Sequence, residues 1–538
     1  MSAPCSQTPP ASSSQAAKRG LLGSSLLVSL MTLVSRVLGL ARDISIALLF
    51  GAGSGADAFF VAFKIPNFLR RLFAEGAFNQ AFVPVLSEYR SQHPSEVRPL
   101  IGAVFIALSS VLFVVTGLAI WGAPWLVWVF APGFAQDADQ LALTAQMLQM
   151  TFPYLALISL TAFCSSILNT YDKFAIPAFT PVWLNLSLIA CAFLLTPWLE
   201  TPIFALAWGV LIAGVIQLIF QLPFLAQLAL LPPLPSSWQA WKQAWQHSGV
   251  KRILDLMLPA LFGVSVSQIN LLLDTILASL LVTGSVSWLY YSDRLVELPL
   301  GVFGIAIATV ILPSLSRQHT QADQTAFGRL LVWGLRLVLL IALPAALGLM
   351  LLAEPLLTTL FQYGAMGTQD VTMAALSLRA YALGLVAFML IKVLAPGFYA
   401  RQDTRTPVRI GVKAMLANMV FNLLLVWHLA HTGLALATAL SAFLNAYWLY
   451  QGLRQAGILT DLNELWPYVL KLSAGLLALA IAVVISSQPL DWWFAATWWM
   501  RTLTLAMQIG LGAAAYFGVL WLLGIRWQAL KTHEPPAS

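Results

Sequence analysis

Charged side chains lie inside two hydrophobic segments near the start of the chain and at the glycine-rich turn between them. A charge at the centre of a bilayer costs about 2.5 kcal/mol or more, so such residues face a protein interior or a wet cavity and usually mark function. Arginine suits phosphate because its planar fork donates two hydrogen bonds at once. Cations outnumber anions here, which indicates a cavity that receives a negatively charged group. The charged residues are Arg36, Arg42, Asp43, Asp57, Lys64, Arg70, Arg71 and Glu75.

The spacing of these residues decides which of them share a helix face. Arg36 and Asp43 are two helical turns apart, so they share a face, and Lys64 and Arg71 do the same. Arg42 points away from its charged neighbours, as does Arg70, so some of the charges must form ion pairs. In the alternative interpretation, the whole group snorkels to the interface or pairs internally and binds no ligand.

A second charged group lies in YYSDRLVELP at 290–299 and holds Asp293, Arg294 and Glu297. When the chain is shifted by about 230 residues, GSGADAFF at 53–60 falls on TGSVSWLY at 283–290, which indicates a weak internal repeat. The same shift places Arg294 level with Lys64, so Arg294 is predicted to face the first group across the cavity. A local contact between Glu297 and either Arg294 or Asp293 is the alternative.

Asp274 is a lone carboxylate well inside a third hydrophobic segment. Asn418 and Asn422 are one helical turn apart on a later segment, and Thr438 follows on the next. Carboxylate, amide and hydroxyl oxygens are ligands for hard cations. The pattern predicts a sodium site or a proton relay, and a single hydrogen-bonded carboxylate is the alternative.

Composition defines the class of protein that must position these residues. The chain has 538 residues, of which 59% are hydrophobic and only 9% charged, against roughly 25% charged in soluble proteins. A spanning helix needs about 20 mostly apolar residues, and the chain offers about fourteen candidates, which predicts an all-α polytopic membrane protein. They are 22–50, 58–88, 98–130, 140–170, 177–198, 201–229, 252–282, 286–315, 328–352, 370–399, 407–429, 432–455, 466–487 and 500–524.

Lysine and arginine gather in alternate loops, with Arg501 the one basic residue on the opposite side. The positive-inside rule therefore predicts that both termini are cytoplasmic. Six helices per repeat give two parallel lobes, an arrangement seen in transporters. We predict a disordered cytoplasmic tail at 1–20, an N-lobe at 21–245, a C-lobe at 246–460, a helix pair at 461–526 and a cytoplasmic tail at 527–538.

Several nucleotide-binding, metal-binding and redox motifs are absent from the sequence. It has no GxxxxGK[ST], no HExxH and no CxxC pair, and its three cysteines have no useful spacing. An ATP-driven motor and a metal-dependent enzyme are therefore not indicated, and no cofactor or nucleic-acid partner is expected. The sequence predicts a protein that is not an enzyme.

Four stretches resemble the MurJ (MviN) family of lipid II flippases, within the multidrug/oligosaccharidyl-lipid/polysaccharide exporter superfamily. They are SRVLGLARD at 35–43, GAGSGADAFFVAFKIPNFLRRLFAEGAFNQAFVPVLSEY at 51–89, GSVSWLYYSDRLVELPLGVFG at 284–304 and KVLAPGFYARQDTRTPV at 392–408. The resemblance implies two six-helix lobes around a cationic cavity and a last helix pair that forms a groove for the lipid tail. It implies substrate-binding roles for Arg36, Arg42, Asp57, Arg70 and Arg294, and more weakly for Ser35, Lys64 and Asn67. It also implies a sodium site at Asp274, Asn418 and Asn422.

The resemblance implies a multi-pass protein of the bacterial inner membrane. Its expected function is to move undecaprenyl-diphosphate-linked disaccharide-pentapeptide (lipid II) to the periplasmic leaflet by alternating access. The membrane potential, with Na⁺ or H⁺ coupling, would drive the transfer, and the cell-wall synthesis machinery is the candidate protein partner. A multidrug or polysaccharide-precursor exporter of the same superfamily is the runner-up. An intramembrane enzyme and a channel are further alternatives.

Overall fold

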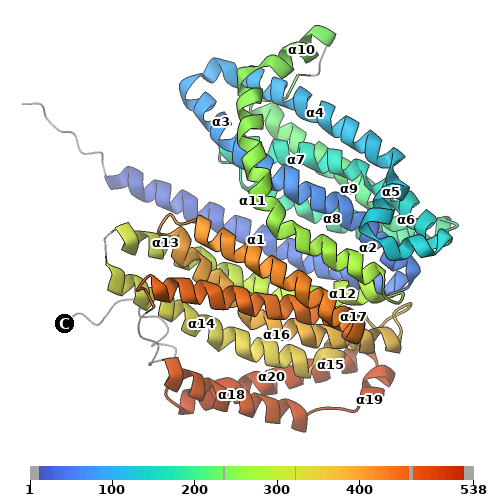
Figure 1. The fold of residues 1–538 in the computed structure, drawn as a ribbon, viewed down its shortest axis with the longest axis vertical. Helices are drawn as coiled ribbons and strands as arrows, with labels where there is room; N and C mark the ends of the chain where they lie inside the picture. The colour runs from blue at the N-terminus through green and yellow to red at the C-terminus, as the bar shows by residue number, and fades with distance from the viewer. Residues whose placement is uncertain (1–10, 234–236, 321–322, 460–464, 526–538) are drawn as a thin grey trace, which may run out of the picture. The chain divides into compact units, whose positions relative to one another are not determined.

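The computed structural model describes residues 11–233, 237–320, 323–459 and 465–525, and these residues form helices with no strand among them (Figure 1). The predicted all-α class is therefore confirmed. The elements are α1 (Ala11–Phe50), α2 (Ser54–Leu69), η1 (Arg70–Phe78), α3 (Asn79–Gln92), η2 (Pro94–Glu96), α4 (Val97–Trp121), α5 (Ala123–Phe130), η3 (Pro132–Gln136), α6 (Ala138–Thr151), α7 (Pro153–Thr170), α8 (Ala175–Leu194), η4 (Thr196–Trp198), α9 (Phe204–Gln227), α10 (Trp238–Gln246), α11 (Ser248–Ser279), α12 (Ser285–Pro299), η5 (Leu300–Gly304), α13 (Ile305–Thr320), α14 (Gln324–Leu351), α15 (Ala353–Phe361), α16 (Thr368–Tyr399), α17 (Arg405–Gln455), α18 (Leu465–Ile485), α19 (Leu490–Ala495) and α20 (Trp498–Leu522).

Nine helical stretches among the described residues are long and apolar enough to cross a membrane. Of the four predicted spans outside these nine, 58–88 and 286–315 fall on helices that are interrupted. Residues 58–88, for example, form α2, η1 and α3, and Pro66 lies inside α2. The multi-pass class follows from these apolar stretches. The count of fourteen spans and the cytoplasmic side of the termini stay predictions.

Two π-helical segments interrupt helices at matching places in the predicted repeat. The segment η1 begins at Arg70 and η5 begins at Leu300, which agrees with the shift of about 230 residues seen in the sequence. A π-helix is rare and often lies at a functional site. Each of these two interrupts the charged helix of its own half of the chain.

The helix α17 covers two predicted spans, 407–429 and 432–455. Its backbone leaves the helical region at Ala430, where φ is 48° and ψ is −133°. The two spans are thus joined by a single sharp break, and the following His431 is buried.

Packing divides the chain into two units. Unit 1 comprises Met1–Ser45, Ala62–Ala123 and Ala145–Val264, and unit 2 comprises Ile46–Val61, Pro124–Thr144 and Ser265–Ser538. The helices α1, α2 and α11 each pass from one unit to the other. The lobes predicted at 21–245 and 246–460 and the helix pair at 461–526 stay predictions. The tail at 527–538 and residues 1–10 of the predicted N-terminal tail lie outside the described residues, and α1 includes residues 11–20.

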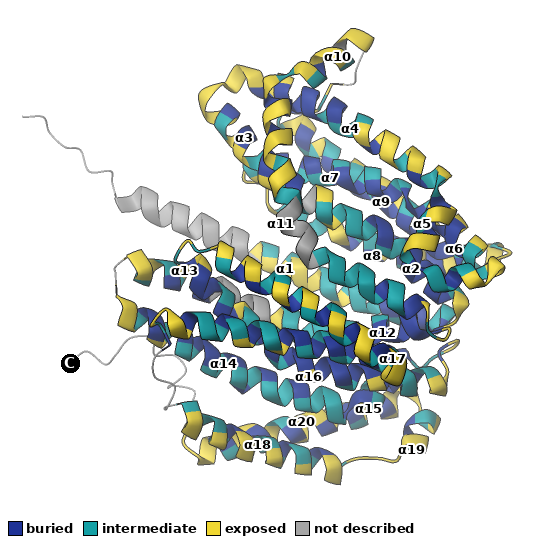
Figure 2. Ribbon diagram, in the orientation of Figure 1, coloured by how far each residue is buried: buried dark blue, intermediate teal, exposed yellow. Residues whose placement is uncertain are grey.

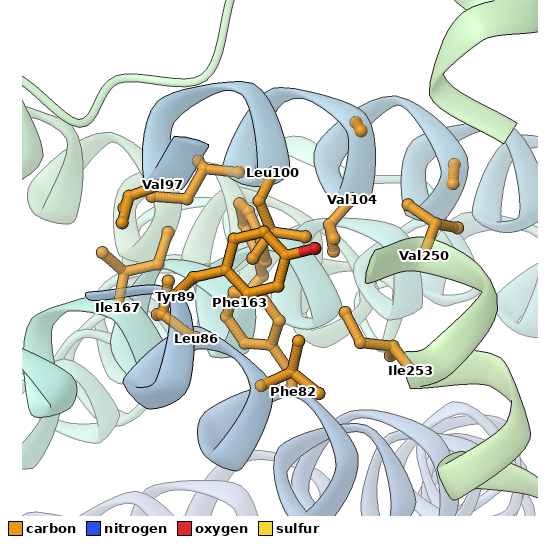
Figure 3. Close-up of a cluster of buried hydrophobic side chains, with 14 of the residues drawn as sticks. Phe82, Leu86, Tyr89, Val97, Leu100, Val104, Phe163, Ile167, Val250 and Ile253 are labelled. Carbon is orange, nitrogen blue, oxygen red and sulfur yellow. The ribbon is translucent and has the colours of Figure 1, made fainter. Parts of the chain in front are cut away.

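The core of unit 1 joins α3, α4, α7 and the start of α11. Phe82 and Phe163 meet at 5.2 Å between ring centroids, and Leu86 and Leu100 are fully buried against them. Figure 3 shows these aromatic and aliphatic side chains converging from separate helices. In a membrane, van der Waals packing among such side chains holds neighbouring helices together.

In unit 2 the helix α16 is the most enclosed, since 61% of its most apolar window is buried, against 22% for α18. Figure 2 shows the same contrast, with dark positions along α16 and exposed ones along α18. A second buried cluster joins the C-terminal helices to α14, since Trp493, Leu472 and Tyr516 belong to one cluster with Leu340. The Tyr516 hydroxyl also donates to the Leu340 carbonyl oxygen at 3.0 Å.

Candidate functional site

Asp57 is a predicted site residue whose carboxylate accepts three hydrogen bonds. It lies in the first turn of α2 and is 1% exposed. One carboxylate oxygen accepts from the Gly284 backbone N–H at 2.6 Å. The other accepts from the Ser287 backbone N–H at 2.9 Å and from the Ser287 hydroxyl at 2.5 Å. The carboxylate therefore caps the N-terminus of α12, where the helix dipole favours a negative charge.

The backbone before α12 is shaped for this cap. Gly284 has φ of 99°, a left-handed conformation that side chains other than glycine rarely adopt. A Cβ atom there would come within 2.7 Å of the Trp288 ring and 2.9 Å of the Ala52 carbonyl oxygen. Glycine is therefore the residue that lets the turn before α12 approach the turn before α2.

Further contacts of unit 2 surround the cap. The Tyr291 hydroxyl donates to the Gly51 carbonyl oxygen at 3.0 Å, and the Ala365 N–H donates to the Leu48 carbonyl oxygen at 2.9 Å. Phe60 stacks on Tyr290 at 3.9 Å between centroids. Residues 46–61 are thus tied to α12 and to the loop before α16. We call this set of contacts, together with the Asp57 cap, the Asp57 latch.

Arg42 is buried in unit 1, and Asp43 and Asn185 accept hydrogen bonds from it. Its guanidinium donates to Asp43 Oδ1 at 2.9 and 2.7 Å and to Asn185 Oδ1 at 3.0 Å. The Asn185 amide nitrogen in turn donates to the Ser35 carbonyl oxygen at 2.9 Å. Some of these charges are expected to form ion pairs, and Arg42 forms one with Asp43. Asn185 of α8 accepts a further hydrogen bond from the Arg42 guanidinium.

The other cations of unit 1 are less enclosed. Arg36 is partly buried, and no hydrogen bond or ion pair holds it among the residues that the structure describes. Arg70 is also partly buried, and its Nε donates to Asn67 Oδ1 at 2.8 Å. Lys64 is partly buried as well. Cationic side chains at such partly buried positions suit an anionic ligand, because charge-assisted hydrogen bonds to phosphate are strong.

Arg294 makes the local contact that the sequence allowed as an alternative. It donates to Glu297 Oε2 at 2.6 Å, and its guanidinium carbon lies 4.8 Å from the centre of the Tyr290 ring. The Arg294 side chain is 34% exposed, and these two neighbours orient its guanidinium. Arg294 belongs to unit 2, whereas Arg36, Arg42 and Arg70 belong to unit 1. Their predicted meeting in one cavity stays a prediction.

The residues predicted for a cation site are assembled in unit 2. The Asn422 amide nitrogen donates to Asp274 Oδ1 at 2.7 Å and to Asn418 Oδ1 at 3.1 Å. The Asn418 amide nitrogen lies 3.5 Å from Thr438 Oγ1 and 3.3 Å from Ser441 Oγ. Asn418 and Asn422 are both fully buried.

The donor set of this cluster fits a hard cation. It offers carboxylate, amide and hydroxyl oxygens, which are the atoms that such ions prefer. Asn422 Oδ1 is buried and has no hydrogen-bond partner among the described residues, so one oxygen remains to be satisfied. No group of three or more His, Cys, Asp or Glu side chains that could hold a metal is found in the described part of the chain.

Four residues of these clusters were missed by sequence reasoning. Asn185 and Ser441 are polar residues inside apolar runs, and that anomaly was the available signal for both. Gly284 precedes α12 and Ser287 lies in its first turn. Glycine and serine are common at helix starts, so their presence there gave no specific signal. Nothing in the sequence paired them with Asp57 beyond the repeat itself.

The interrupted helices and buried charges define a polytopic transporter-type membrane protein. The fold resembles a solved inward-facing multidrug-resistance transporter of the MATE family, in the MOP superfamily. The TM-score is 0.65 at 13% identity, and the match covers 81% of this chain and 99% of that one. At that identity the likeness concerns the fold alone.

The family model described as lipid II flippase MurJ matches residues 46–504, and the chain belongs to this family. A probable lipid II flippase MurJ of Vibrio cholerae is 48% identical over 519 residues, covering 95% of this chain and 98% of the relative. The lipid II flippase MurJ of Burkholderia cenocepacia is 43% identical, over 93% of this chain and 97% of the relative. A solved MurJ structure in an inward closed conformation has TM-score 0.76 and 25% identity, covering 92% of this chain and 100% of that one.

Proposed function

We propose that this protein flips lipid II from the cytoplasmic to the periplasmic leaflet of the bacterial inner membrane and leaves its covalent bonds intact. Membership of the lipid II flippase family supports this function. The observation on which the mechanism rests is the Asp57 latch, because it joins a turn near the start of the chain to a helix 230 residues further on through a few reversible hydrogen bonds.

The energetic difficulty of this function is the head group. A diphosphate carries about two negative charges, and hydrocarbon cannot solvate them. Partly buried guanidinium groups replace that solvation, and Arg36, Arg70 and Arg294 are the residues we assign to it. The membrane potential favours outward movement of negative charge by about 2.3 kcal/mol per charge at 100 mV, or roughly 4–5 kcal/mol for two charges.

We propose that the Asp57 latch sets the side of the membrane from which the substrate can enter. While Asp57 caps α12, residues 46–61 stay attached to the second half of the chain. Loss of the cap exposes a carboxylate and three donors to water, where each finds a new partner at small net cost. We propose that the latch opens once per transfer and closes again after release.

We also propose that a monovalent cation at Asp274 stabilises one state of this cycle. Asp274, Asn418, Asn422 and Thr438 would hold the ion through oxygen atoms, and Ser441 would support Asn418. A bound cation would supply a positive charge beside Asp274. These residues hold the Asp274 carboxylate in its orientation and surround it with polar atoms.

The runner-up is an exporter of drugs or polysaccharide precursors. Its support is the fold shared with a multidrug-resistance transporter, and family membership does not favour it. Purified protein in proteoliposomes decides between the two. We expect rapid transfer of fluorescent lipid II between leaflets and no pumping of cationic dyes. Dye transport without lipid II transfer would overturn the proposal.

A further inference from the structure

A cavity of about 160 Å³ lies inside unit 1, among the walls of α4, α7, α10, α11 and η1. Val104, Val250 and Ile253 line it, and Figure 3 shows them facing one another from α4 and α11. None of the predicted substrate-binding or cation-binding residues lines it. The cavity is therefore separate from the groups assigned to transport.

Carbon atoms form almost the whole wall of this cavity. Besides aliphatic and phenylalanine side chains, its lining includes Ser159 and Trp245. Ser159 Oγ and Trp245 Nε1 are both buried, and neither has a hydrogen-bond partner among the described residues. Apolar cavities of this size stay dry and accept hydrocarbon, so water does not satisfy those two groups.

The surroundings place one end of the cavity at the membrane interface. Trp245 belongs to α10, where Trp238 stacks on Trp241 at 4.6 Å and Trp241 lies 6.1 Å from Trp245. Tryptophans of a short amphipathic helix mark the head-group level of a bilayer. Basic residues surround this end, since Lys242 and Lys251 are exposed, which agrees with its predicted cytoplasmic side.

The other end of the cavity meets the hydrocarbon region. Val111 and Val115 are 45% and 36% exposed on α4, and α4 is one of the helices apolar enough to cross the membrane. Leu254, from α11, is 39% exposed beside them. A lipid chain can therefore enter from the bilayer without crossing a polar barrier.

We propose that this cavity binds an acyl chain of a glycerophospholipid from the cytoplasmic leaflet. The chain fills the space between α4 and α11, and the ester carbonyl accepts a hydrogen bond from Trp245 Nε1. A polyprenyl chain matches less well, because it carries no acceptor along its length and would leave the indole N–H unsatisfied. The bound acyl chain packs between the first part of α11 and α4 and so stabilises this part of α11 within unit 1.

The test uses the full chain in nanodiscs that contain phosphatidylglycerol with a diazirine on one acyl chain. After irradiation, mass spectrometry locates the labelled peptides. We expect labelling within 104–115 and 245–257 of the wild-type protein. Ala107→Phe fills the cavity and should lower this labelling by about fivefold or more. The matched control is Val114→Phe on the same helix, since Val114 is 57% exposed and lies outside the lining.

A second variant keeps the test decisive if Ala107→Phe does not fold. Leu254→Trp blocks the exposed end of the cavity from α11 and should lower the labelling in the same way. Excess unlabelled phosphatidylglycerol should also displace the probe, whereas undecaprenyl phosphate should not. Equal labelling in wild type and both variants would overturn the proposal. Displacement by undecaprenyl phosphate alone would assign the cavity to the prenyl tail and overturn it too.

Discussion

Ser287 donates both its backbone N–H and its hydroxyl to one carboxylate oxygen of Asp57, at 2.9 and 2.5 Å. The two residues are 230 positions apart in the chain. Two donors from one residue fix the carboxylate at the first turn of α12, and Gly284 holds its other oxygen. A charged acceptor with three donors is worth more than neutral hydrogen bonds, yet each bond can be exchanged for one with water. Such a contact can hold a conformation and still be released.

Asp57→Asn should weaken the latch without removing the side chain. The amide keeps one acceptor oxygen, but it loses the charge and turns an NH₂ group toward a donor. Hydrogen bonds to charged groups contribute about 1.5–3 kcal/mol, so amide exchange at Gly284 and Ser287 should accelerate about tenfold to a hundredfold. The matched control is Asp139→Asn, an exposed carboxylate in the first turn of α6. Unchanged protection in Asp57→Asn would show that the cap does not hold α12.

Gly284→Ala should disturb the same latch through the backbone. The φ of 99° is unfavourable for alanine, and the added Cβ would meet the Trp288 ring and the Ala52 carbonyl oxygen. We expect a loss of at least about 1 kcal/mol in stability, measured as a lower melting temperature in detergent. Gly53→Ala, in the neighbouring turn, meets no atom within 4 Å and should melt close to wild type. Equal melting temperatures for the two variants would contradict this explanation of Gly284.

Asn185→Ala should destabilise unit 1 through Arg42. The substitution removes the acceptor of one guanidinium N–H and the donor to the Ser35 carbonyl oxygen. Leaving buried polar groups unsatisfied costs about 1–3 kcal/mol. Thermal unfolding should show a clear loss, while Asn169→Ala, at an exposed site on α7, should show almost none. If both variants unfold like wild type, the Arg42 ion pair does not depend on Asn185.

Asp274→Asn tests the proposed cation site. The wild-type melting temperature should rise when NaCl replaces choline chloride at constant ionic strength, because a ligand that binds only the folded state stabilises it. The rise should vanish in Asp274→Asn and persist in Asp255→Asn, which alters an exposed carboxylate of the same helix. An equal rise in wild type and Asp274→Asn would show that sodium does not bind at Asp274.

Sequence reasoning predicted the helical class and the residues near Asp274 because both depend on local pattern. Apolar runs of span length predict helices directly. Asn418 and Asn422 share a helix face by their spacing, and the structure places Asn422 beside Asp274 and Asn418 beside Asn422. A cation at this cluster stays a prediction.

The partners of the charged groups were harder to predict. The family resemblance implies a substrate-binding role for Asp57, whereas its cap on α12 depends on the backbone of Gly284, which no side-chain pattern reveals. Arg42 was expected among the ligand-binding arginines, and its burial against Asn185 comes from the packing of α1 on α8. The π-helical segments at Arg70 and Leu300 also escaped prediction, since a π-helix differs from an α-helix by one extra residue and leaves no compositional signal.

Transfer of lipid II by an Arg36→Gln variant in proteoliposomes tests the central claim most directly. Arg36 is partly buried and is not held by a hydrogen bond or ion pair in the described part of the chain, so its loss should leave the melting temperature near wild type. Loss of one charge-assisted contact to a diphosphate should slow transfer by about tenfold or more. Arg409→Gln, which alters an exposed cation, should transfer at the wild-type rate. Wild-type transfer by Arg36→Gln would contradict the account, because a guanidinium that can be removed without effect does not solvate the head group.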